Sequence, residues 1–132
     1  MNIALARSRY KQAAAIGEPE INDPHEVIHV TLRELERSLG VMEQLQKAER
    51  ATAGEHANRS LTAIYILQSS LDFEKGGDLA TNLFQVYEYV RFHVLKAWRN
   101  EGDAELSQAK LAIGEILSAW QTIGDQVGER SE

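Results

Sequence analysis

Residues 23–42 read "DPHEVIHVTLRELERSLGVM", and this stretch decides the fold class. An aspartate followed by a proline is typical of a helix start, because the carboxylate caps free N–H groups and proline is tolerated in the first turn. Apolar residues then recur in steps of four and three at Ile28, Leu32, Leu35, Leu39 and Met42. They share one face of a helix, so the stretch predicts an amphipathic helix that packs against other elements.

Three later segments repeat this spacing, and glycines mark the breaks before them at Gly54, Gly76-Gly77 and Gly102. The apolar positions after Gly54 are Ala57, Leu61, Ile64, Leu67 and Leu71. Those of the segment entered through Gly77-Asp78 are Leu79, Leu83, Val86, Val90, Val94 and Ala97. Those of the last segment, which we expect Asp103 to cap, are Leu106, Ala109, Ile113, Leu117 and Trp120. No segment alternates in steps of two, so the sequence predicts an all-α protein, an antiparallel four-helix bundle.

The chain of 132 residues is the size of one domain, which we divide into three parts. Residues 23–127 form the predicted bundle. Residues 1–22 form an N-terminal arm packed on it, with a short extra helix near residues 3–15, and residues 128–132 form a frayed tail. The arm carries Arg7, Arg9 and Lys11, whereas the whole chain has a net charge of −6. An acidic body repels phosphates, so we expect no nucleic acid as a partner.

The composition also bears on the compartment. The chain has no cysteine, and its apolar runs are shorter than the roughly 20 residues that cross a membrane. The run Ile3-Ala4-Leu5-Ala6 is too short for the core of a signal peptide. These features predict a cytoplasmic protein with no membrane insertion.

The opening stretch contains His25-Glu26-Val27-Ile28-His29, which matches the HExxH pattern of zinc metalloproteases. Histidines four apart on a helix can bind one zinc ion, with the glutamate as base. Here the pattern follows Pro24, so it occupies the first helical turn, where the helix dipole disfavours a dication. No third histidine follows before His56. We therefore interpret the pattern as a helix start and predict no metal site.

A second candidate site is "HVLKA", residues 93–97, which resembles the HxLKG motif of histidine phosphotransfer domains. The resemblance implies that His93 accepts a phosphoryl group and that Lys96 balances its charge. Ala97 replaces the glycine of the motif, and helical spacing puts His93 at the edge of the apolar stripe. The alternative is a boundary histidine that packs beside Tyr89.

The third predicted helix carries a second apolar stripe, formed by Phe84, Tyr87, Leu95 and Trp98. A helix that is apolar on more than one side is either surrounded by other elements or offers a surface to a partner. In a four-helix bundle no helix is surrounded. The sequence leaves two alternatives, in which neighbouring helices and the arm bury the stripe permanently or a partner covers it.

Residues 71–97, "LDFEKGGDLATNLFQVYEYVRFHVLKA", carry a more specific pattern. Its parts are Leu71-Asp72, Gly76-Gly77 followed by Asp78, Ala80-x-Asn82-Leu83 and Val86-Tyr87-x-Tyr89. In this order the pattern resembles the flagellar secretion chaperone family, FliS. Further similarity is found at Tyr10-Lys11, Asp23-Pro24-x-Glu26 and Trp120, so it spans nearly the whole chain.

The resemblance implies a chaperone that is not an enzyme and uses no cofactor. Such proteins bind the C-terminal segment of flagellin, prevent its premature polymerisation and deliver it to the flagellar type III export gate. Their N-terminal arm occupies an apolar surface that flagellin also uses. From this and the second stripe we expect the following partner-binding residues: Tyr10, Ile16, Leu71, Asn82, Leu83, Phe84, Val86, Tyr87, Val90, Leu95 and Trp98. A homodimer formed by exchange of the arm is a further arrangement that the sequence allows.

Overall fold

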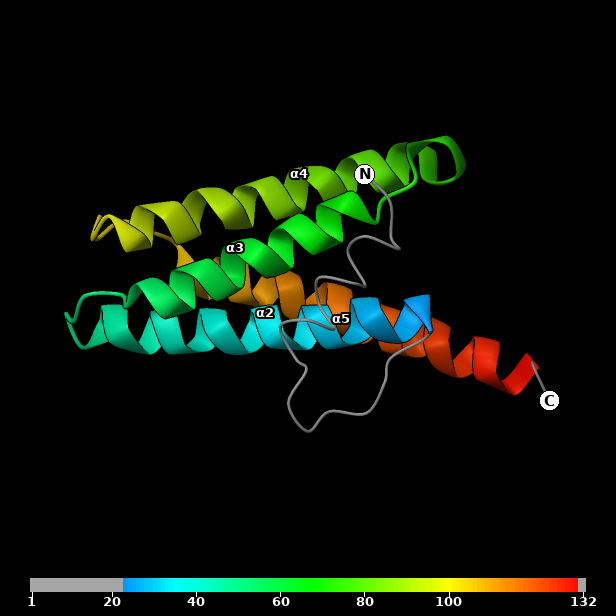
Figure 1. Cartoon of the computed structure of the whole chain (residues 1–132), viewed down its shortest axis with the longest axis horizontal. Helices are drawn as coiled ribbons and strands as arrows, with labels where there is room; N and C mark the ends of the chain where they lie inside the picture. Colours follow the sequence, from blue (N-terminus) through cyan, green and yellow to red (C-terminus); the bar gives the residue numbers. More distant parts are fainter. Residues whose placement is uncertain (1–22, 131–132) are drawn as a thin grey trace.

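The computed structural model describes the backbone of residues 23–130 and the side chains of residues 23–124. This part of the chain contains four helices and no strand (Figure 1): α2 (Pro24–Lys47), α3 (Gly54–Ser69), α4 (Phe73–Trp98) and α5 (Leu106–Arg130). The predicted all-α class is confirmed. The predicted arm lies outside the described residues. At the other end, α5 continues past Gly128, where we expected the tail to begin.

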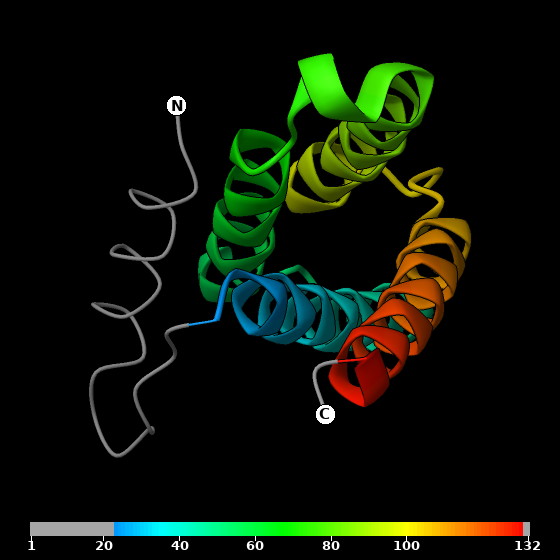
Figure 2. The same cartoon turned by 90° about the vertical axis from the view of Figure 1, so that its right-hand side faces the viewer.

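The four helices lie at the corners of a square, and neighbours in sequence are neighbours in space (Figure 2). α2 has extensive interfaces with α3 and α5, whereas α4 closes the bundle through smaller interfaces with the same two helices. The links, residues 48–53, 70–72 and 99–105, are short, so consecutive helices run antiparallel. Among the described helices, α4 is therefore the one least covered by its neighbours.

The core is built mainly from the apolar positions that the spacing predicted. Those that are buried are Ile28, Leu32, Leu35, Leu39, Met42, Ala57, Ile64, Leu67, Val90, Val94, Ala97, Leu106, Ala109, Ile113 and Leu117. Leu79 is an exception and its assignment to the core is wrong, because 66% of it is exposed while the next residue, Ala80, is buried. No helix in the described part of the chain is both long and apolar enough to cross a membrane.

The start of α2 agrees with the prediction. Asp23 Oδ1 accepts a hydrogen bond from the His25 N–H at 3.0 Å, and Pro24 occupies the first helical position. Both features satisfy or remove N–H groups that would otherwise lack a partner at the helix end. The helix therefore begins where local sequence alone dictates.

The start of α5 differs from the prediction that Asp103 caps it. The helix begins at Leu106, and the N–H of the preceding Glu105 donates to His93 Nδ1 of α4 at 2.9 Å. Asp103 instead accepts a hydrogen bond from Lys96 Nζ at 2.7 Å. The expected cap is wrong, because Asp103 lies three residues before the helix and Lys96 of α4 holds its carboxylate, and spacing along the chain does not reveal that contact.

α4 also begins earlier than expected, at Phe73 rather than after the double glycine. Asp72 caps it, because its carboxylate accepts a hydrogen bond from the Lys75 N–H at 3.0 Å. Gly77 then interrupts the helix with φ 50° and ψ −126°. This backbone conformation is essentially restricted to glycine, since a side chain would collide with the neighbouring peptide groups.

We expect Gly77→Ala to lower the free energy of unfolding by about 1–3 kcal/mol, because alanine is strained at this positive φ. The matched control is Gly40→Ala in the interior of α2, where a new Cβ would lie 3.6 Å from Lys110 Cε, an ordinary contact. That change should raise stability by about 0.5–1 kcal/mol, because alanine favours helix more than glycine does. Urea unfolding measures both values. A Gly77→Ala variant as stable as the parent would show that residue 77 does not adopt this positive φ.

Candidate protein-binding surface

The most apolar part of the described surface lies on α4. Of the eight large apolar side chains that are exposed within residues 23–124, five belong to this helix: Phe73, Leu79, Phe84, Phe92 and Trp98. The other three, Val41, Leu111 and Ile123, are spread over α2 and α5. Single exposed apolar residues are common on proteins, but their concentration on one element is typical of a site for a partner.

The two aromatic residues near the start of α4 form a cluster. The rings of Phe73 and Phe84 meet edge to face, with centroids 6.0 Å apart. Residues eleven apart on a straight helix would be separated by about 16 Å along its axis. The contact therefore depends on the break at Gly77, which lies between them in the sequence.

A second apolar region lies at the other end of α4. Trp98 is 50% exposed and Leu95, three residues before it, is half-buried. The start of α3 lies beside the indole, because a Cβ on Gly54 would be 3.8 Å from Trp98 Nε1. This end of the surface is therefore shared by α3 and α4.

A polar contact joins α3 and α4 between these two apolar regions. Glu88 Oε1 accepts a hydrogen bond from Gln68 Nε2 of α3 at 2.9 Å, and Arg91 donates to the same carboxylate at 3.3 Å. The hydrogen bonds from Gln68 and Arg91 lower the pKa of the Glu88 carboxyl. The carboxylate is therefore charged at neutral pH, and a partner meets two apolar regions with a fixed ion pair between them.

The structure separates the expected partner-binding residues by exposure. Those exposed on α4 are Asn82, Phe84 and Trp98, and those half-buried at its edges or just before it are Leu71, Leu83, Val86 and Leu95. Tyr87 and Val90 are buried in the core, so in this conformation they support the surface from beneath. Tyr10 and Ile16 lie outside the described residues.

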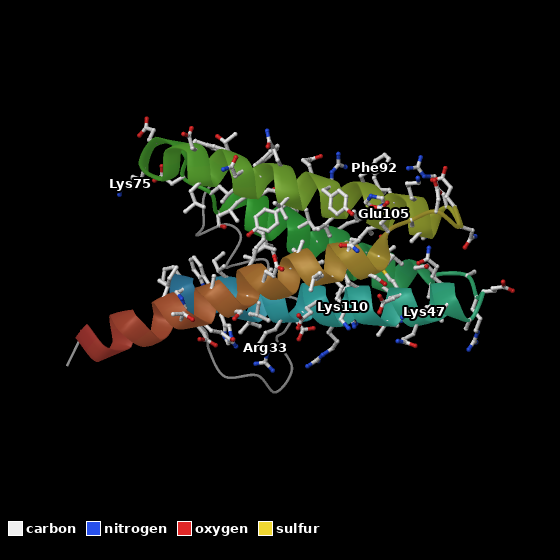
Figure 3. All side chains as sticks on the ribbon, turned by 180° about the vertical axis from the view of Figure 1, so that it is seen from behind. Arg33, Lys47, Lys75, Phe92, Glu105 and Lys110 are labelled. Carbon is white, nitrogen blue, oxygen red and sulfur yellow. The ribbon has the colours of Figure 1, made fainter. Side chains whose placement is uncertain are left out.

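Sequence reasoning missed three exposed apolar residues of α4, namely Phe73, Leu79 and Phe92. Phe92 lies about 80° around the helix from Phe84, so it falls outside the predicted stripe. Figure 3 shows it beside the start of α5, where Glu105 is labelled. Phe92 could have been predicted from its residue type alone, since a phenylalanine outside the apolar stripes is unusual on a helix face that contacts only solvent.

His93 does not have the geometry of a phosphoryl acceptor, which must face solvent. It is only 6% exposed, and its Nδ1 accepts the hydrogen bond from the Glu105 N–H. Its Nε2 lies 3.9 Å from a Glu105 carboxylate oxygen, which would repel a phosphoryl group. The Tyr89 and His93 rings meet edge to face at 4.6 Å. The structure therefore agrees with the packing alternative.

The two histidines of the HExxH pattern contact α5 rather than a shared ligand. The His25 ring stacks on Trp120 with centroids 4.5 Å apart, and Trp120 Nε1 donates to the His25 carbonyl at 2.9 Å. His29 Nε2 lies 3.1 Å from Gln121 Nε2. Within residues 23–124, no three histidine, aspartate or glutamate side chains are placed to hold a metal ion. The two histidines therefore connect the start of α2 to the C-terminal half of α5.

Comparison with known proteins gives consistent matches. A family model described as "Flagellar protein FliS" matches residues 4–127. The chain is 28% identical to the flagellar secretion chaperone FliS of Vibrio cholerae over 115 residues, 86% of this chain and 85% of that one. It is 28% identical to FliSB of Pseudomonas aeruginosa over 122 residues, 89% and 94% of the two chains. The Salmonella typhimurium FliS is 32% identical over 81 residues, 60% and 59% of the two chains. No solved structure matches the chain at a significant level.

Proposed function

Because this chain belongs to the FliS family of flagellar secretion chaperones, we propose that it binds the C-terminal segment of flagellin in the cytoplasm. Binding prevents premature polymerisation, and the complex delivers flagellin to the flagellar type III export apparatus without a catalytic step. The observation that carries the proposal is the concentration of exposed apolar side chains on α4.

The dimensions of the α4 surface suit a helical segment. Phe84 and Trp98 are fourteen residues apart, which is about 21 Å along a helix, and they lie about 40° apart around its axis. A client segment of about four turns spans this distance. A chain that folds on binding loses conformational entropy, so it needs large apolar anchors to offset that cost. The two aromatic side chains supply such anchors, and the Glu88–Arg91 pair between them offers polar contacts.

In the free protein, we propose that the arm of residues 1–22 covers this surface until flagellin displaces it. Exposed aromatic residues on one helix favour aggregation unless something covers them. The arm contains Tyr10 and Ile16, whose apolar side chains suit such a cover.

We expect the double change Phe84→Ser and Trp98→Ser to weaken flagellin binding at least tenfold. The loss of two exposed aromatic anchors removes apolar contact area from the complex, and aromatic residues at the centre of an interface are often worth 2 kcal/mol or more each, as an order of magnitude. Isothermal titration with purified flagellin measures the dissociation constant. Flagellin lacking its C-terminal segment should give no heat.

The matched control is Leu111→Ser, which removes an exposed apolar side chain from α5, away from α4. It should leave the dissociation constant within a factor of two. Circular dichroism checks that each variant remains helical. An unchanged affinity in the folded double variant would refute the proposed surface. An equal loss of affinity in Leu111→Ser would show that any exposed apolar side chain contributes to binding, wherever it lies on the protein.

A further inference from the structure

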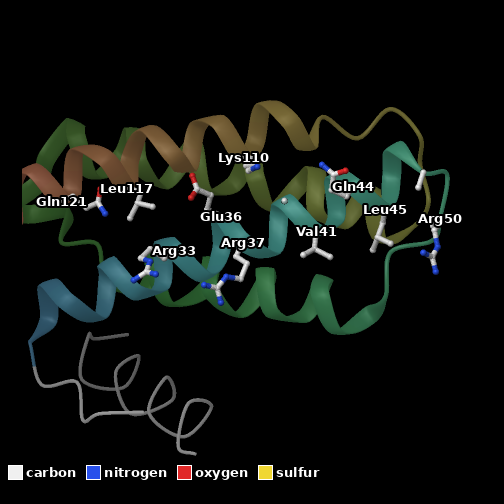
Figure 4. A pocket seen from close by; sticks show the side chains of 12 residues that line it. Arg33, Glu36, Arg37, Val41, Gln44, Leu45, Arg50, Lys110, Leu117 and Gln121 are labelled. Atoms are coloured by element: carbon white, nitrogen blue, oxygen red, sulfur yellow. The ribbon is translucent and has the colours of Figure 1, made fainter. Parts of the chain in front are cut away.

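A second feature lies away from α4, on the outer face of α2 beside its seam with α5. A groove of about 920 Å³ runs over the outer face of α2, from Arg33 to Arg50, and reaches α5 at Lys110, Leu117 and Gln121 (Figure 4). Its lining includes the apolar residues Val41, Leu45 and Leu117. α2 and α4 occupy diagonal corners of the bundle and barely touch, so this groove is separate from the candidate flagellin-binding surface.

The groove is basic although the protein is acidic. Four cationic side chains line it, from Arg33, Arg37, Arg50 and Lys110, against the single carboxylate of Glu36, while the whole chain has a net charge of −6. Arg37 pairs with Glu34 at 3.6 Å. The other three cations have no carboxylate within 4.0 Å among residues 23–124.

At two glycines of the α2–α5 seam, the absence of a side chain leaves room for a long side chain from the opposite helix. A Cβ on Gly40 of α2 would lie 3.6 Å from Lys110 Nζ of α5, so the lysine crosses the seam over that glycine. A Cβ on Gly114 of α5 would lie 2.7 Å from Glu36 Oε2, so the glutamate crosses in the other direction. Figure 4 shows Glu36 and Lys110 along the seam, whereas Arg33 and Arg37 project from the other side of α2.

The apolar residues of the groove continue the basic row on α2. Arg33, Arg37, Val41 and Leu45 follow one another at intervals of four, so they form one ridge along the helix. Val41 is 36% exposed, and it is the one exposed large apolar side chain of α2 within the described residues. A ridge with cations at one end and apolar side chains at the other complements a helix with acidic and apolar side chains on one face.

We propose that the α2–α5 groove binds an acidic amphipathic helix of a second protein. Along α2 the groove runs from Arg33 to Leu45, twelve residues or about 18 Å, and Arg50 extends it onto the α2–α3 link, so a helix of roughly 18 residues is long enough to cover it. The basic segment of this chain, which carries Arg7, Arg9 and Lys11, has the wrong charge to occupy the groove. The proposal does not depend on flagellin binding, and its test uses no flagellin.

The test uses a fluorescent helical peptide of about 18 residues, with leucines at intervals of three and four flanked by glutamates. We expect fluorescence anisotropy to show binding that weakens as NaCl is raised from about 50 to 300 mM. The double change Arg33→Glu and Arg37→Glu should weaken binding at least tenfold. The control, Arg59→Glu with Arg99→Glu, makes the same change in net charge at exposed arginines outside the groove and should alter affinity less than twofold.

Each other outcome overturns the proposal. Absence of binding at millimolar peptide would show that the groove does not recognise acidic helices. An equal affinity for the same peptide with lysine in place of glutamate would make charge irrelevant. An equal loss in the control variant would assign the effect to the overall charge of the protein. Displacement of the peptide by a lower concentration of an oligonucleotide of equal charge would assign the groove to nucleic acid.

Discussion

Replacement of Tyr87 by alanine is expected to lower the free energy of unfolding by about 3–5 kcal/mol. The side chain is 3% exposed and belongs to the core cluster that joins α4 to the other helices. Its removal leaves a cavity that neighbouring side chains fill only in part, and α4 already has the smaller interfaces of the bundle. Urea unfolding followed by circular dichroism gives the difference.

The matched control is Tyr87→Phe, which keeps the ring in the core and should change stability at neutral pH by less than about 1 kcal/mol. The two proteins should differ in alkali. Burial raises the pKa of Tyr87 to about 12, so the folded state favours the neutral phenol. The stability that depends on a neutral Tyr87 is fully present below about pH 10 and is lost as the pH rises through about 12. The loss of folding free energy is about 3 kcal/mol. Tyr87→Phe should therefore unfold at a higher pH than the parent.

This result bears on the binding experiments, since sequence analysis placed Tyr87 among the partner-binding residues. A weaker affinity of Tyr87→Ala for flagellin would follow from a less stable bundle as well as from a lost contact. Tyr87→Phe separates the two effects, because it preserves the core. A Tyr87→Ala protein as stable as the parent would show that the ring is not part of the core.

Replacement of Trp120 by alanine is the second large effect, with an expected loss of about 2–4 kcal/mol. The indole stacks on the His25 ring with the two planes 7° apart, and its N–H donates to the His25 carbonyl. His25 Nε2 in turn lies 3.0 Å from the Trp120 carbonyl oxygen. Truncation removes the stack and one of the two hydrogen bonds, so the start of α2 separates from α5.

A milder change tests the same contact from the opposite side. A Cβ on Gly124 would collide with His25 Cε1, so Gly124→Ala should push the imidazole away from the indole. Its expected cost is about 1–3 kcal/mol, less than that of Trp120→Ala. Urea unfolding of both variants checks the order. Full stability of Trp120→Ala would be incompatible with this contact.

Local sequence was sufficient where a helix supplies its own signals. The Asp23-Pro24 pair defined the start of α2, and the apolar spacing identified five of the side chains that α2 buries, namely Ile28, Leu32, Leu35, Leu39 and Met42. These signals act over a few residues, so they can be read without knowledge of the fold.

Sequence reasoning failed where the deciding partner lies on another helix or where the backbone is irregular. His93 accepts the Glu105 N–H across the α4–α5 link, so the local aspartate was an incorrect guide to the start of α5. Leu79 fits the apolar period, but Gly77 interrupts the helix two residues earlier and shifts the buried position to Ala80. The spacing of apolar residues could not predict which side of α4 is exposed. The core stripe and the second stripe lie next to each other on the helix, and both contain large apolar side chains.

The hydrogen bond between the Glu105 N–H and His93 has a consequence for how separation of the helices can be observed. Amide protons inside α5 are protected by carbonyl groups of the same helix, so their exchange with solvent reports fraying of that helix. The Glu105 amide proton is held by an imidazole nitrogen of α4, so its exchange reports the opening of a contact between two helices. In isotopically enriched protein, a single resonance in a nitrogen–proton correlation spectrum thus serves as a gauge of bundle opening, read without an attached probe or a substitution.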